Sequence, residues 1–121
     1  MQNILITGCS SGIGLQTALT LKDNNYKVYA SAKKIEDVEM LRNLGFETFK
    51  IDVRNKEDIS NALNTILQND KKLDAVFNNA GFGQPGAVED LSVEVLKEQF
   101  ETNFFGLHEV TIQAMKIFRK Q

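Results

Sequence analysis

The stretch from residue 7 to residue 14 carries residue types that can hold a phosphate group. It reads Thr-Gly-Cys-Ser-Ser-Gly-Ile-Gly and directly follows an apolar run, so it joins a predicted strand to a predicted helix. Glycines permit a tight turn and close backbone approach, and the free N–H groups and positive dipole of a helix start attract a pyrophosphate. The candidate phosphate-binding residues are Thr7, Gly8, Ser10, Ser11, Gly12, Ile13 and Gly14. The alternative is a glycine-rich turn without a ligand, whereas a P-loop is excluded because no Lys-Ser or Lys-Thr pair follows the last glycine.

A second polar segment follows about 20 residues past the glycines, where sites for NAD usually place Asp or Glu against the ribose 2′-hydroxyl. Here the segment reads Ala-Ser-Ala-Lys-Lys from residue 30, and the next acid is Glu36. Ser31, Lys33 and Lys34 would accept a 2′-phosphate that a carboxylate would repel. The segment therefore favours NADP over NAD, and the alternative is a solvated strand end that carries two lysines.

Alternating strand and helix patterns provide the elements that must position these residues. Apolar runs rich in β-forming residues predict strands at residues 3–7, 27–32, 46–51 and 73–77. Apolar residues at helical spacing predict helices at residues 12–22, 36–44, 56–68, 92–100 and from about 103 to the end. Because right-handed crossovers between such strands give a parallel sheet, we expect an α/β fold. The prediction is one domain over residues 1–121 with a partial, Rossmann-type doubly wound sheet in the strand order 3-2-1-4.

Four motifs in this order resemble the classical short-chain dehydrogenase/reductase family, and the resemblance covers the whole chain. They are the glycine spacing of residues 8–14, Asp52-Val53, Asn78-Asn79-Ala80-Gly81 and Asn103-Phe104-Phe105-Gly106. The resemblance implies that Asp52 and Val53 line the adenine pocket. It also implies that Asn79, Ala80 and Gly81 pass close to the adenosine ribose. The family transfers hydride between a nicotinamide and a carbonyl or alcohol carbon, with Asn103 in its catalytic set.

The resemblance also implies a catalytic serine, tyrosine and lysine, the last two in a Tyr-x-x-x-Lys motif on a helix. The lysine lowers the pKa of the tyrosine, which exchanges a proton with the substrate oxygen. Tyr29 and Lys33 match this spacing, but along a strand they stand about 13 Å apart, whereas one helical turn would bring them together. We therefore expect only Asn103 of the catalytic set. Residues 1–121 would then be a cofactor-binding domain truncated before the catalytic segment and inactive by itself.

Composition restricts the partners. The chain has 121 residues, of which 42% are hydrophobic and 25% charged, as in ordinary globular domains. A formal net charge of −2 gives no reason to propose nucleic acid as a partner. No apolar run approaches the roughly 18 residues of a membrane span, and no signal-peptide pattern is present, so we expect a cytoplasmic protein without membrane association. Cys9 is the single cysteine, and no Cys/His cluster indicates a metal site.

Two functions from different classes remain open on the sequence alone. The first is an NADP-dependent oxidoreductase that acts on a small carbonyl or alcohol substrate, and the retained Asn103 favours it. The second is a non-catalytic dinucleotide-binding module, favoured by the absence of a Tyr-x-x-x-Lys motif in a helical context. An extended-type epimerase or dehydratase is disfavoured, because such enzymes typically have two residues between the first glycines, and three separate Gly8 from Gly12.

Self-association is expected through the last helix or through the open edge of the sheet. In the order 3-2-1-4 the fourth strand lies at an edge and presents unpaired backbone groups. The resemblance implies that the last helix packs in a subunit interface. The candidate interface residues on that helix are Phe104, Leu107, Met115 and Phe118.

Overall fold

Four short strands form the centre of the fold, in a computed structural model that describes all residues from Met1 to Gln121. The strands are β1 (Asn3–Ile6), β2 (Lys27–Ala32), β3 (Glu47–Lys50) and β4 (Ala75–Phe77). All neighbouring strands are parallel, and their order is β3-β2-β1-β4, which confirms the predicted order. β1 is therefore central, with Leu5 opposite Tyr29 on one side and Val76 on the other.

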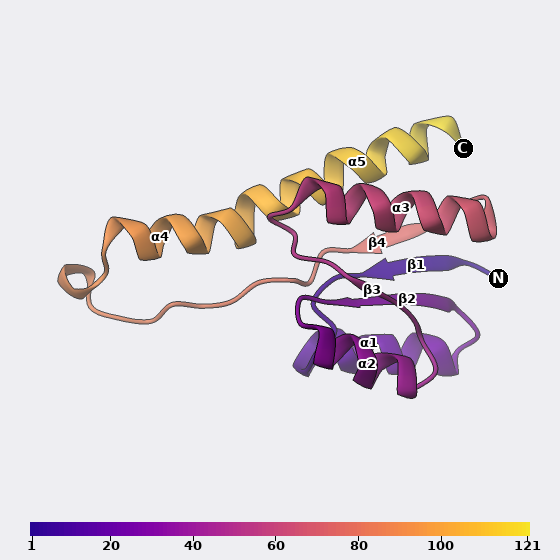
Figure 1. Cartoon of the computed structure of the whole chain (residues 1–121), viewed down its shortest axis with the longest axis horizontal. Coiled ribbons are helices and arrows are strands. Elements are labelled where there is room, and N and C mark those ends of the chain that lie inside the picture. The colour runs from indigo at the N-terminus through magenta and orange to yellow at the C-terminus, as the bar shows by residue number, and fades with distance from the viewer.

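Helices cover both faces of the sheet, as in a doubly wound fold. They are α1 (Gly12–Asp23), α2 (Ile35–Asn43), α3 (Lys56–Asp70), α4 (Val93–Phe100) and α5 (Leu107–Lys120). α1 and α2 lie on one face, and α3 and α5 lie on the other (Figure 1). A short 3₁₀ turn, η1 (Val88–Asp90), precedes α4. The strands and the first three helices fall within two residues of their predicted bounds.

The last two helices differ from the prediction, because they are not separate. A π-helical segment, η2 (Glu101–Gly106), joins α4 directly to α5. The joined helices run past the end of the sheet, so that α4 lies beyond it (Figure 1). No residue of α4 is buried.

No helix of the structure combines the length and apolarity that crossing a membrane requires.

Alternation of side chains along the strands creates two cores, one on each face of the sheet. Ile4 and Ile6 pack on the side of α1 and α2, where Cys9 is also fully buried. Leu5 and Tyr29 pack on the side of α3 and α5, where Val110 of α5 closes the core.

Side-chain caps fix where α3 and α4 begin. The Asn55 side chain accepts hydrogen bonds from the backbone N–H groups of Glu57 (3.0 Å) and Asp58 (3.1 Å), which satisfies two donors at the start of α3. Ser92 accepts one from the N–H of Val95 (3.2 Å) at the start of α4.

Candidate functional site

The glycine-rich loop after β1 is held against the loop after β4. The Thr7 hydroxyl accepts hydrogen bonds from the backbone N–H groups of Asn79 and Ala80, each at 3.0 Å. The Asn79 side chain in turn donates to the carbonyl of Gly8 (2.9 Å). Gly8 adopts a φ of +69°, which non-glycine residues rarely adopt. The predicted pyrophosphate loop and the predicted ribose segment are thus locked together at the carboxyl edge of the sheet.

The start of α1 is free to receive an anion. Ser11 precedes the helix in an extended conformation, and its side chain makes no capping hydrogen bond. The first turn of α1 contains no acidic residue. The first N–H groups of a helix lack intrahelical acceptors, so a bound phosphate would satisfy donors that no side-chain cap satisfies here.

A cleft of about 500 Å³ opens between this helix start and the ends of β2, β3 and β4, within the size range of small-molecule sites. It brings together most of the residues that the sequence selects. These are Gly8, Ser10, Ser11, Ile13, Lys33, Asp52, Val53, Asn79, Ala80 and Gly81. The cleft is also lined by residues that the sequence analysis did not select, namely Ile51, Arg54, Phe82, Glu98 and Thr102.

Of the three residues selected for a 2′-phosphate, only Lys33 lines the cleft. Ser31 is fully buried, and its hydroxyl donates to the carbonyl of Ile6 (3.0 Å), so that it holds β2 to β1. Lys34 is exposed at the start of α2. Among the glycine-loop residues, Thr7, Gly12 and Gly14 do not line the cleft.

Asp52, at the end of β3, is bound by two cations. Both of its oxygens are held by the Arg54 guanidinium, with Nε–Oδ1 at 3.0 Å and Nη2–Oδ2 at 2.8 Å. Lys33 Nζ lies further away, at 4.0 Å. The hydrogen bonds from Arg54 are the main reason why the pKa of Asp52 is lowered to about 2. Sequence reasoning missed Arg54, because only the turn after β3 brings it onto the carboxylate two residues earlier.

This ion pair predicts a specific loss of stability in acid. The folded-state pKa of Asp52 lies below its ordinary value of 3.8, so its carboxylate stabilises the fold fully above about pH 4. That contribution, about 1 to 2 kcal/mol at this partly exposed site, is lost as the pH falls towards 2. Urea denaturation should show the stability gap between wild type and D52N narrowing between pH 5 and pH 2.5. A gap that does not change with pH would contradict the assignment.

Two asparagines tie the segment after β4 to the long helix. Asn78 donates to the Thr111 hydroxyl at 3.1 Å. In η2, the Asn103 side chain accepts from the N–H of Phe82 (2.9 Å) and donates to its carbonyl (2.6 Å). A Cβ on Gly81 would stand 2.8 Å from the Asn103 oxygen. Asn103 therefore positions Gly81 and Phe82, which line the cleft, and does not itself line it.

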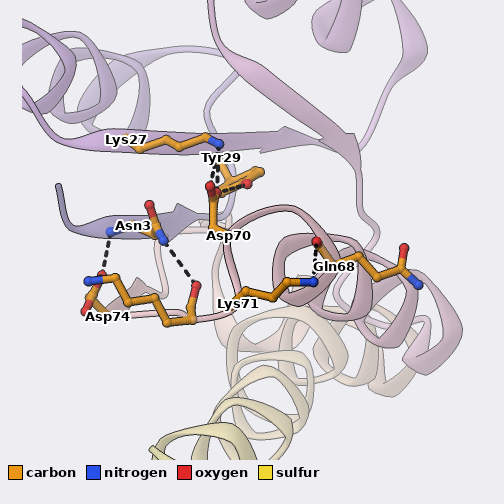
Figure 2. Close-up of polar contacts among 8 residues, drawn as sticks. Asn3, Lys27, Tyr29, Gln68, Asp70, Lys71 and Asp74 are labelled. Carbon is orange, nitrogen blue, oxygen red and sulfur yellow. Dashed lines mark hydrogen bonds and ion pairs between the residues drawn. The ribbon is translucent and has the colours of Figure 1, made fainter.

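Tyr29 and Lys33 do not form a catalytic pair. Figure 2 shows the Tyr29 side chain beside Asp70, to which its hydroxyl donates, and Lys27 Nζ lies 2.9 Å from the same carboxylate. Lys33 lies in the cleft at the carboxyl edge. The structure therefore supports the sequence-based rejection of this Tyr-x-x-x-Lys match.

Cys9 is inert in this structure. Its thiol is fully buried and donates to the carbonyl of Ile6 at 3.4 Å. Burial raises the pKa of Cys9 to about 11, so the thiolate that redox chemistry needs is disfavoured. No group of three or more His, Cys, Asp or Glu side chains is placed to hold a metal ion.

A larger hollow of about 690 Å³ lies between α3 and α5, away from the strand ends. Its walls are mostly polar side chains, and one of its lysines, Lys56, pairs with Glu109 at 3.6 Å. It contains no glycine loop, and the helix start that borders it, that of α3 at Lys56, is already capped by the Asn55 side chain. The cleft at the carboxyl edge is therefore the candidate site, as expected for an open α/β sheet.

Comparisons with known proteins agree with this fold. The family model for short chain dehydrogenases matches residues 2–121. The chain is 40% identical over 115 residues to the uncharacterised oxidoreductase YbbO of Escherichia coli K12, covering 94% of this chain and 43% of YbbO. It is 35% identical over 120 residues to the 3-ketodihydrosphingosine reductase of Bacteroides thetaiotaomicron, covering 98% of this chain and 43% of that enzyme. The chain thus spans less than half the length of these relatives.

A solved structure gives the same result. ElxO with NADP bound superposes with a TM-score of 0.89 at 28% identity, over 98% of this chain and 51% of ElxO. The match covers nearly all residues of the fold described above. The chain therefore belongs to the short-chain dehydrogenase family.

Proposed function

We propose that this chain is the cofactor-binding part of an NADP(H)-dependent oxidoreductase that transfers hydride between the nicotinamide and a carbonyl or alcohol carbon of a small molecule. The observation that carries the proposal is the cleft, in which an uncapped helix start without acidic residues lies beside Lys33. The NADP bound to ElxO and the name of the Bacteroides reductase support the cofactor and the carbonyl chemistry.

Each wall of the cleft fits one part of a dinucleotide. The loop of residues 8–14 would hold the pyrophosphate through backbone N–H groups, and Lys33 would pair with the 2′-phosphate. Asp52 and Val53 would border the adenine, and residues 79–81 the adenosine ribose. Bound NADPH would supply the hydride. The residues of this chain bind and orient the cofactor, and Asn103 fixes the segment through Phe82 that leads from the ribose towards the substrate.

Cofactor titration tests the proposal. We expect NADPH to bind about tenfold more tightly than NADH, a difference in binding free energy of about 1.4 kcal/mol. The ionic contact between Lys33 and the 2′-phosphate would supply this difference. K33E should reverse the preference, whereas K50E, which changes an exposed lysine on β3 outside the cleft, should leave it unchanged. Equal affinity of the wild type for NADPH and NADH would contradict the choice of cofactor.

A non-catalytic dinucleotide-binding module is the second candidate. The observation that favours it is that both polar groups of the Asn103 side chain are occupied by Phe82. We expect residues 1–121 alone to bind NADPH without consuming it. Carbonyl-dependent oxidation of NADPH by the native polypeptide would support the enzyme, and binding without turnover in that polypeptide would support the module.

We also propose that the protein is a cytoplasmic homo-oligomer. Apolar side chains of η2 and α5 are exposed, among them Phe104, Leu107 and Met115, while Phe118 is partly buried against the second core. The free edge of β4 is the other candidate surface. Light scattering should therefore give a mass above that of one chain, and a sharp monomer at high concentration would contradict the proposal. Fractionation of cells tests the proposed cytoplasmic location separately.

A further inference from the structure

The charged side chains of the cleft are arranged around Asp52. Four of them line it, namely Lys33, Asp52, Arg54 and Glu98. The Arg54 fork occupies both Asp52 oxygens at 2.8 and 3.0 Å, a geometry that restricts the guanidinium and largely neutralises the carboxylate. The backbone N–H of Arg54 also donates to Asp52, at 3.0 Å.

Lys33 is left with only a weak hold on the same carboxylate. Its Nζ stands 4.0 Å from Asp52, beyond hydrogen-bond distance, and its side chain is 62% exposed. Arg54 therefore takes Asp52 as its partner, and the ammonium of Lys33 remains available to a ligand. Lys33 and Arg54 reach Asp52 from different elements, since Lys33 follows β2 and Arg54 follows β3.

Removal of Arg54 would change both charges that a 2′-phosphate meets. An unpaired Asp52 carboxylate would attract Lys33, which carries no other ion pair. It would also repel the dianionic phosphate, and Glu98, which also lines the cleft and lies near enough to act on the charge of Arg54, would add to that repulsion. The cleft would then resemble a site in which an acid, and not a base, faces the adenosine ribose.

We propose that Arg54 is a specificity-determining residue, which keeps the cleft selective for a 2′-phosphorylated adenosine by holding Asp52 away from Lys33. This inference rests on the NADP function proposed above. Arg54 acts through Asp52 and is therefore a positioning residue. Its effect should appear in the discrimination between ligands with and without the 2′-phosphate, and not in general affinity for adenosine.

Calorimetric titration with two fragments isolates this effect. Adenosine 2′,5′-bisphosphate and 5′-AMP differ only in the 2′-phosphate, so contacts to adenine and to the 5′-phosphate cancel in the ratio of their dissociation constants. On the full native polypeptide in about 0.1 M salt, where charges roughly 10 Å apart still interact, we expect the wild type to prefer the bisphosphate about tenfold. R54Q should lower this preference about fivefold, and R54K, which keeps the charge, should lower it less.

A second substitution and a matched control distinguish discrimination from a general loss of structure. Adding D52N to R54Q removes the unpaired carboxylate and should restore the preference, whereas D52N alone should raise it above that of the wild type. R42Q removes an arginine that pairs with Glu39 on the exposed face of α2, and it should leave the ratio unchanged. Thermal unfolding verifies that each variant folds. If R54Q does not fold, the preference of D52N compared with that of the wild type tests the proposal by itself.

The outcomes separate this inference from the function on which it rests. A wild type that binds neither fragment, or binds both equally, overturns the NADP function and the inference together. A wild type that prefers the bisphosphate, with R54Q showing the same ratio, overturns only the inference. A fall in the ratio that D52N reverses supports it.

Discussion

Replacing Gly8 by alanine should lower the free energy of unfolding by about 3 kcal/mol, whereas the same change at Gly12 should cost about 1 kcal/mol. Both glycines have positive φ, +69° and +58°, so the conformational cost of alanine is shared. The difference arises from packing. A Cβ on Gly8 would stand 2.8 Å from the backbone Cα of Ala80, while a Cβ on Gly12 would meet nothing within 4 Å. Urea denaturation of the two variants measures the difference directly.

The same pair of variants tests the coupling between the two loops of the cleft. In G8A the segment at Ala80 must move, so we expect NADPH affinity to fall about tenfold or more. G12A should retain affinity within about threefold, because its backbone has open space in which to adjust. Equal losses of stability in G8A and G12A would show that the contact between the loops contributes nothing.

Asp70→Ala should lower the free energy of unfolding by about 2 kcal/mol, although Asp70 lies outside the cleft. The Tyr29 hydroxyl is buried and has Asp70 as its hydrogen-bond partner, so the substitution leaves a buried donor unsatisfied and Lys27 without its counter-charge (Figure 2). Y29F removes the donor itself and should cost less, about 1 kcal/mol. Thermal or urea unfolding of both variants gives the comparison.

The control for this prediction is D23A, because Asp23 is exposed at the end of α1 and makes no hydrogen bond or ion pair through its side chain. It should change stability by less than about 0.5 kcal/mol. Y29F should also bind NADPH as the wild type does, since Tyr29 lies at the opposite edge of the sheet from the cleft. A Y29F variant that folds normally and loses cofactor binding would refute the structural role of this tyrosine.

The sequence predicts the scaffold well because its signals are local. The apolar run of residues 3–7, the glycines after it and the cap at Asn55 each specify an element within a few positions, and the alternation of elements determines a parallel sheet. The join between α4 and α5 was missed for a physical reason. The predicted gap fell at residues 101 and 102, where a π-helical segment continues the helix without a break. Gly106 lies inside this joined helix and against Val53, and a Cβ there would stand 2.6 Å from a Val53 methyl. The glycine is thus required by packing inside a continuous helix.

The sequence predicts the residues of the cleft that act through their backbone better than those that act through a side chain. Gly8 and Ala80 follow from strand ends that a parallel sheet brings to one edge. Ser31 was selected by position alone, but alternation along β2 directs its hydroxyl into the sheet, onto Ile6. Arg54 and Asn103 find their partners through a turn and a π-helical segment, whose geometry no residue pattern specifies.

The two cores take shape at different times when the chain is synthesised from its N-terminus. The buried residues of the core under α1 and α2 end at Phe46, with the partly buried Phe77 packed against them, whereas the opposite core is completed only by Val110. At the usual pace of translation the second face of the sheet therefore waits on the order of several seconds for its last cover. During that interval Leu5 and Tyr29 lack the cover of α5. This incompletely covered face is the surface that a chaperone of nascent chains would have to bind.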